Sequence, residues 1–144
     1  MTMDYAGDLS PEEAMTMLAS DKNAILVDVR TRPEWQFVGI PDLSALDKEP
    51  VLLEWQSYPS MSLNQNFVAS LMSDLNERGL PPDAPVLFLC RSGARSSAAA
   101  SAIAAHGRSR CYNIAGGFEG SHDASRHRGH TEGWKARGLP WAQN

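Results

Sequence analysis

The chain has few cysteines, no long apolar run and no excess of basic residues. Its 144 residues include two cysteines, Cys90 and Cys111, too few for the disulfide framework of a small secreted protein. No apolar stretch approaches the roughly 20 residues that span a bilayer, and the acidic start MTMDYAGDLSPEE has no signal-peptide core. The formal net charge of −4 argues against a nucleic-acid-binding protein. We therefore expect a cytoplasmic protein with free thiols that binds neither nucleic acid nor membrane.

Length and composition favour a single globular domain over residues 1–144. Hydrophobic residues make up 42% of the chain and charged residues 21%, which is typical of a folded protein and not of a disordered one. There is no internal repeat and no low-complexity segment. A chain of this length buries about two thirds of its unfolded surface, which is enough for one core.

Short apolar runs alternate with helical patterns along the chain. Ser10-Pro11-Glu12-Glu13 predicts a helix start with a capping box, and residues 67–78 have apolar residues at helical spacing before Gly79. We expect further helices at 33–38, 96–106 and 132–137, and strands at 24–29, 51–55, 85–89 and 111–114. Cys111 opens the last strand and is expected in the core. This alternation predicts an α/β fold whose mostly parallel sheet has helices on both faces.

The segment CRSGARS follows the strand predicted at 85–89. In parallel sheets ligands bind at the carboxyl ends of strands, where Cys90 lies. A thiol reacts as thiolate, and a helix N-terminus or a nearby arginine lowers the ordinary thiol pKa of about 8.5. Arg91 and Arg95 supply that charge, and Gly93 lets backbone N–H groups turn inward as an anion-binding nest. A buried structural cysteine is the simpler alternative, but it does not account for these neighbours. We predict that Cys90 is a nucleophile.

These residues resemble a known family. CRSGAR at 90–95 resembles the six-residue active-site loop of the rhodanese family of sulfurtransferases, which has the form Cys-Arg-x-Gly-x-Arg. VDVRTRPEW, YNIAGGFEG and GLPW resemble, in order, the Asp-Val-Arg-x-x-x-Glu segment, the strand with a Gly-Gly turn and the terminus of the family. The resemblance extends over about residues 8–141 and implies a central sheet of about five strands. It also implies that Cys90 carries a persulfide, cradled by the backbone of Arg91, Ser92, Gly93, Ala94 and Arg95.

Two segments depart from the pattern of this family. The family often has Gly-His-Ile-Pro-Gly-Ala after the Asp-Val-Arg segment, whereas this chain has VGIPDLSAL at 38–46 without the histidine, a position that we interpret as structural. An insertion is expected at 121–132, before Trp134. Its histidines match no standard zinc spacing. We therefore predict no metal and no cofactor, and we interpret the insertion as a basic rim that attracts anionic donors.

Asp28, Arg30 and Glu34 are interpreted as supporting residues. By resemblance they hold the underside of the loop; Asp28 could accept hydrogen bonds from it, and Arg30 could pair with Glu34 at helical spacing. Guanidinium groups suit oxyanions, and we favour Arg91, as the more outward of the two arginines, for binding the donor. Arg95 could bind the donor too or lock the loop to a carboxylate such as Glu34.

The resemblance implies a thiosulfate sulfurtransferase with two half-reactions. Cys90 takes the outer sulfur of a small anionic donor such as thiosulfate, and a thiol, cyanide or a protein then accepts it. Two alternatives stay open. Related phosphatases and arsenate reductases use seven-residue loops of the form Cys-x5-Arg, whereas four residues separate Cys90 from Arg95 here. Non-catalytic sulfur-carrier or partner-binding modules of the family usually lack the cysteine, which this chain has.

Overall fold

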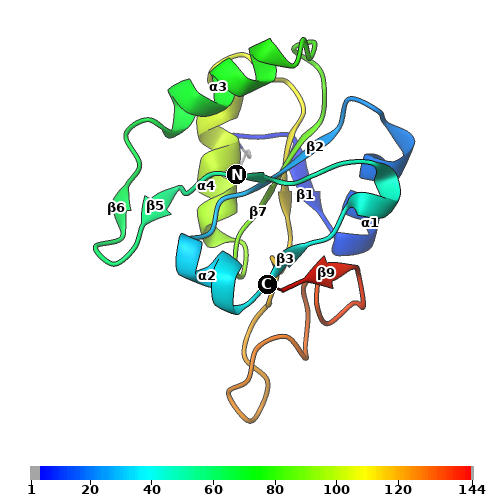
Figure 1. Ribbon diagram of the computed structural model, residues 1–144, viewed down its shortest axis with the longest axis vertical. Helices are drawn as coiled ribbons and strands as arrows, with labels where there is room; N and C mark the ends of the chain where they lie inside the picture. Colours follow the sequence, from blue (N-terminus) through cyan, green and yellow to red (C-terminus); the bar gives the residue numbers. More distant parts are fainter. Residues whose placement is uncertain (1–3, 144) are drawn as a thin grey trace.

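A parallel sheet forms the centre of the structure, a computed structural model that describes residues 4–143 (Figure 1). Its five strands lie in the order β1-β8-β7-β2-β4, and every neighbouring pair is parallel. The strands are β1 (Gly7–Leu9), β2 (Ile25–Asp28), β4 (Val51–Leu52), β7 (Val86–Leu89) and β8 (Cys111–Ile114). The helices are α1 (Pro11–Ser20), α2 (Arg32–Phe37), α3 (Phe67–Glu77), α4 (Ala94–Ala104) and the 3₁₀ turn η1 (Ser44–Leu46). The predicted α/β architecture is confirmed.

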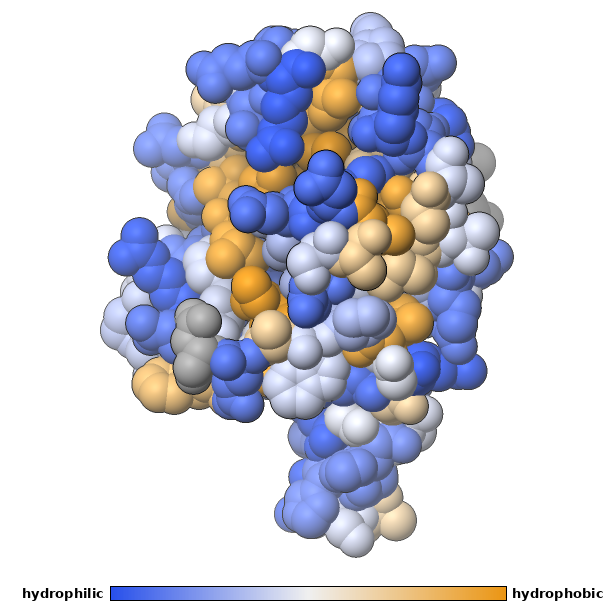
Figure 2. All heavy atoms as spheres, turned by 45° about the vertical axis from the view of Figure 1, so that its right-hand side comes forward, coloured by the Kyte–Doolittle hydropathy of each residue, from blue (hydrophilic) through white to orange (hydrophobic). Residues whose placement is uncertain are grey.

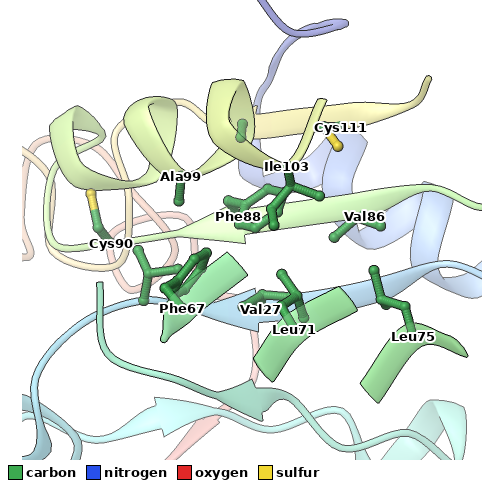
Figure 3. Close-up of a cluster of buried hydrophobic side chains, with 12 residues drawn as sticks. Val27, Phe67, Leu71, Leu75, Val86, Phe88, Cys90, Ala99, Ile103 and Cys111 are labelled. Atoms are coloured by element: carbon green, nitrogen blue, oxygen red, sulfur yellow. The ribbon is translucent and has the colours of Figure 1, made fainter. Parts of the chain in front are cut away.

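Both faces of the sheet are covered, which explains why its strands are continuously apolar. All four residues of β7 are buried. On one face, Val86 and Phe88 pack with α3 and α4 in a cluster that includes both cysteines (Figure 3). On the other face, Leu87 and Leu89 pack with α1 and with residues of the C-terminal segment. β7 therefore lies in the middle of the core and ends directly before Cys90.

Local signals begin and end the helices. Ser10 caps α1: its hydroxyl accepts from Glu13 N, and the Glu13 carboxylate accepts from Ser10 N. Gly79 follows α3 with a φ of 69°, the left-handed conformation that commonly ends a helix. α4 begins two residues before the predicted start of 96, directly from the CRSGARS loop.

Two sequence-based predictions about elements are wrong. The strand expected over 51–55 ends at Leu52, because the chain then turns into the hairpin of β5 (Gln56–Ser57) and β6 (Ser62–Leu63). The helix expected over 132–137 is a series of turns between Gly133 and Gly138, which have φ values of 98° and 73°. Gly133 lies inside the expected range, and its positive φ is incompatible with a right-handed helix.

The short strands at the edges of the fold were not predicted from the sequence. Strand β1 adds to the edge of the sheet beside β8. Strand β9 (Trp141–Ala142) pairs with β3 (Ile40–Pro41), which brings the C-terminal segment beside α2 (Figure 1). Among residues 4–143, no helix is long and apolar enough to cross a membrane. The segment between β8 and β9 projects from the body of the fold, and its surface is largely hydrophilic (Figures 1 and 2).

Candidate active site

Cys90 lies between the carboxyl end of β7 and the first turn of α4 (Figure 3). The residue is 1% exposed, and its Sγ accepts a hydrogen bond of 3.0 Å from Gly93 N. Gly93 has a φ of 119°, which side-chain-bearing residues rarely adopt. The first N–H groups of a helix have no partner within the helix, and its dipole favours negative charge at that end. The backbone around Cys90 Sγ therefore presents N–H groups and a helix end that favour negative charge.

The turn after β8 forms hydrogen bonds with the backbone of the CRSGARS loop. Phe118 N donates to Cys90 O at 2.8 Å, and the amides of Glu119 and Gly120 both donate to Arg91 O, at 3.0 and 3.1 Å. A Cβ atom on Gly117 would lie 2.5 Å from Cys90 O, far inside van der Waals contact. The Gly-Gly turn therefore lets two backbone segments approach closely enough to bond the loop.

An ion pair between Glu34 and Arg95 connects the loop to α2. Arg95 donates from Nη1 to Glu34 Oε1 at 2.8 Å and from Nη2 to Oε2 at 3.0 Å, and Thr31 donates to Glu34 from its amide and hydroxyl. Burial by itself would raise the pKa of Glu34, but the hydrogen bonds from Arg95 and Thr31 outweigh it and lower that pKa. Burial likewise opposes the charged form of Arg95, whose pKa is nevertheless raised by Glu34. Arg95 thus anchors the loop to α2.

Asp28 and Arg30 form a second ion pair, which is fully buried. Arg30 Nη2 lies 2.6 Å from Asp28 Oδ2 and donates to Gly39 O at 2.7 Å, and its guanidinium lies over the ring of Phe118, 4.2 Å from the centroid. The expected pairing of Arg30 with Glu34 is wrong, because α2 begins after Arg30 and helical spacing does not apply. The hydrogen bonds that the Asp28 carboxylate accepts come from Arg30 and not from the Cys90 loop.

Three polar residues near Cys90 were missed by the sequence analysis. Ser96 Oγ lies 3.2 Å from Cys90 Sγ and also bonds the side-chain oxygen of Asn113. Asn113 Nδ2 donates to Asp8 Oδ1 at 3.0 Å. The one local signal was an asparagine inside the apolar strand CYNI, where a buried polar group needs a partner.

Cys90 lies at the base of a cleft of about 480 Å³. The β5–β6 hairpin forms a wall that the sequence did not suggest, through Gln56, Tyr58 and Met61. Tyr58 is 62% exposed, so this wall offers apolar surface to a bound molecule. Arg91 is exposed in the cleft, as expected of the outward arginine. The remaining lining comes from the loop and α2: Thr31, Pro33, Glu34, Ser92, Ala94 and Arg95.

Cys111 lies at the far end of the same core cluster (Figure 3). It is fully buried, and burial raises the pKa of its thiol to about 11. Cys111 pairs with Val86 across the sheet, four residues before Cys90, which corresponds to about 13 Å along a strand. Disulfide formation needs Cα atoms within about 7 Å. The expected core position of Cys111 is confirmed.

Residues of the insertion form one cluster that could hold a metal ion. The nearest ligand atoms of Asp123, His127 and His130 all lie within 4.8 Å of one another. Asp123 Oδ1 already accepts from the amides of Ser125 and His127, and both histidines are exposed. The absence of a bound metal stays a prediction.

Comparison with known proteins identifies the family. Residues 6–144 match the family described as STR4 middle domain. The chain belongs to this family. Its curated relatives include an uncharacterized protein of Rickettsia conorii, 44% identical over 129 residues that cover 90% of this chain and 91% of the relative. A counterpart in Rickettsia prowazekii is 43% identical with the same coverage.

Solved structures place the STR4 middle domain among rhodanese-like folds. The crystal structure of Rv0390 from M. tuberculosis has a TM-score of 0.85 and 48% identity, covering 97% of this chain and 99% of that one. A polysulfide-sulfur transferase homodimer from Wolinella succinogenes has a TM-score of 0.59 at 23% identity, covering 98% and 80%. A rhodanese-like domain protein from Staphylococcus aureus has a TM-score of 0.52 at 20% identity, covering 78% and 87%. The rhodanese-like fold is therefore confirmed.

Proposed function

We propose that this STR4 middle-domain protein is a sulfurtransferase that moves sulfane sulfur from a small anionic donor through a persulfide on Cys90. The observation that carries the proposal is the position of Cys90 Sγ, which lies at the base of the cleft and accepts the Gly93 N–H at the start of α4. This arrangement stabilises an anionic sulfur. No step requires a cofactor.

In the first half-reaction, the Cys90 thiolate attacks the outer sulfur of a donor such as thiosulfate. An Sγ–S bond forms, the S–S bond of the donor breaks, and sulfite leaves with the electron pair. The new terminal sulfur bears the negative charge, which the N–H groups of the loop stabilise. Exposed Arg91 offers its guanidinium to the sulfonate oxygens in the cleft.

In the second half-reaction, a thiol, cyanide or protein thiol attacks the terminal sulfur. The Sγ–S bond breaks and its electron pair returns to Cys90 as thiolate, so the enzyme is regenerated. The cleft is open to solvent beside the hairpin that carries Tyr58 and Met61. An acceptor can therefore approach the persulfide along an apolar wall.

The size of the loop favours sulfur over phosphoryl chemistry. Arg95, the last loop residue, donates from both Nη1 and Nη2 to the Glu34 carboxylate. These two nitrogens are therefore not free to bind a tetrahedral oxyanion together. Two donors face Cys90 Sγ, the Gly93 amide and the Ser96 hydroxyl, and both converge on a single sulfur atom. A phosphoryl group needs several converging donors.

Intact mass spectrometry after thiosulfate treatment tests the proposal. Wild-type protein and a Cys111→Ala control should each gain one sulfur atom that cyanide removes, while Cys90→Ser should gain none. Assays with an aryl phosphate run in parallel and should show negligible turnover. Efficient phosphate hydrolysis without sulfur loading would establish the phosphatase alternative, and a folded protein inactive in both assays would be a binding module.

A further inference from the structure

The hydroxyl of Ser96 lies within hydrogen-bond reach of three acceptors. Its Oγ is 3.2 Å from Cys90 Sγ and in hydrogen-bond contact with Asn113 Oδ1, with Gly93 O a third neighbour at 3.2 Å. A serine hydroxyl has one proton, so it donates to one of these atoms at a time. Ser96 is fully buried, so water does not provide an alternative partner. The hydroxyl proton therefore goes to whichever of these acceptors competes best for it.

The side chain of Asn113 is oriented from the edge of the sheet. Its Nδ2 donates to Asp8 Oδ1 at 3.0 Å, and the same carboxylate oxygen accepts from Tyr5 at 3.0 Å. An ionised carboxylate only accepts, so the nitrogen of the Asn113 amide faces Asp8 and the oxygen faces Ser96. A chain of hydrogen bonds thus runs from β1 through β8 and α4 to the sulfur of Cys90.

We propose that Ser96 is a catalytic residue that switches its hydrogen bond between Asn113 and Cys90 Sγ as sulfur is transferred, an inference that rests on the proposed function. In the persulfide, Sγ is uncharged and Asn113 Oδ1 is the better acceptor. When the acceptor removes the terminal sulfur, the electron pair of the broken bond returns to Sγ. The hydroxyl then turns and donates to the departing thiolate, while its proton stays on Ser96.

Asn113 and Asp8 act as positioning residues in this scheme. They hold the hydroxyl away from Sγ while Cys90 is uncharged, and they do not contact the reacting sulfur. The other charged groups around Cys90 are Arg91, the Glu34–Arg95 pair and the Asp28–Arg30 pair. These groups are retained when Ser96 alone is changed, so their effects cancel in a comparison with the wild type.

The proposal predicts opposite effects of Ser96→Ala on the two half-reactions. A donor to the thiolate stabilises the leaving group of unloading but also the nucleophile of loading. At a pH where alkylation of Cys90 has reached its plateau, loading by thiosulfate should be unchanged or faster. Unloading by cyanide should be slower by about tenfold or more, since hydrogen bonds to charged groups are among the stronger ones.

Single-turnover kinetics followed by quenched mass spectrometry measure each half-reaction separately. Ser97→Ala is the matched control, because Ser97 is adjacent but its hydroxyl donates to Ala94 O; both rates should stay at the wild-type value. Asp8→Asn should change the rates of the two half-reactions in the opposite direction to Ser96→Ala. With the amide of Asn113 free to turn, the proton of Ser96 stays with Sγ, so loading slows and unloading does not.

Two results would overturn the role of Ser96. If Ser96→Ala slows both half-reactions by the same factor, the side chain only shapes the loop; if it slows neither, the hydroxyl is not used. Ser96→Thr, which keeps a hydroxyl, should restore unloading where it folds as judged by circular dichroism. Failure of wild-type protein to accept sulfur at all would instead refute the proposed function.

Discussion

Removing the carboxylate of Glu34 would test whether the contact with Arg95 holds the reactive loop. The two side chains are 19% and 17% exposed and share two hydrogen bonds of 2.8 and 3.0 Å. Exposed ion pairs contribute about 0–1 kcal/mol, and breaking a fully buried pair costs about 3–5 kcal/mol. For this intermediate case we expect Glu34→Gln to lower the free energy of unfolding by about 1–3 kcal/mol. The midpoint of thermal unfolding should fall by about 3–10 °C.

The same substitution should also slow sulfur loading by about tenfold or more, because small displacements of reacting groups have large effects on rate. Urea unfolding and thiosulfate loading measured on the same samples provide the two readouts. Glu12→Gln is the control: Glu12 pairs with Arg137 at 3.3 Å, but both side chains are about half exposed, so neither readout should change. Unaltered stability and loading in Glu34→Gln would refute the idea that this pair holds the loop.

The contribution of Glu34 to stability should also depend on pH. The pKa of Glu34 is lowered in the folded protein, so the folded state favours the ionised carboxylate more than the unfolded state does. Its contribution is therefore complete above the ordinary glutamate pKa of about 4.3 and is lost as pH falls through the lower folded value. The difference in free energy of unfolding between wild type and Glu34→Gln should be constant near neutral pH and shrink below about pH 4.

Two further substitutions separate structure from chemistry. Cys111→Ala should keep sulfur loading and lose about 1 kcal/mol in urea unfolding; lost loading in a folded variant would indicate a relay between two cysteines. Gly117→Ala should abolish loading while circular dichroism stays native, because the added Cβ would lie 2.5 Å from Cys90 O. Gly79→Ala is its control, since Gly79 also has a positive φ, 69°, but nothing lies near its Cβ position; normal loading in Gly117→Ala would contradict the close packing.

The sequence predicted those parts of the fold that depend on neighbouring residues. The capping box of Ser10 and the continuous apolar run of β7 are local patterns, and both elements formed where expected. Strands β1 and β6 have three and two residues, too few to show periodicity, and their partners lie elsewhere in the chain. The sequence analysis offered two roles for Arg95, binding the donor or pairing with a carboxylate such as Glu34. The second was suggested because the VDVRTRPEW and CRSGAR segments carry opposite charges at these positions.

The rest of the site could not be predicted because it depends on contacts between distant segments. Asp8 and Asn113 are 105 residues apart in sequence, and no local pattern joins them. The hairpin that carries Tyr58 and Met61 reaches the cleft only through the path of the chain after β4. Helical spacing suggested a partner for Arg30, but the residue lies before α2 and pairs with Asp28 instead.

The geometry of the reactive loop depends on three contacts with residues outside it. Glu34 holds Arg95 from the side of α2, the turn at Phe118 bonds the carbonyls of Cys90 and Arg91, and Asn113 bonds Ser96 from β8. Glu34 follows β2, the turn at Phe118 follows β8 and Asn113 lies within β8, so the packed sheet fixes their spacing. A loop of six residues with one glycine has many other conformations when isolated. The conformation of the loop around Cys90 is therefore a property of the whole domain, and under the proposed function the motif CRSGAR transfers sulfur only where the surrounding sheet supplies these partners.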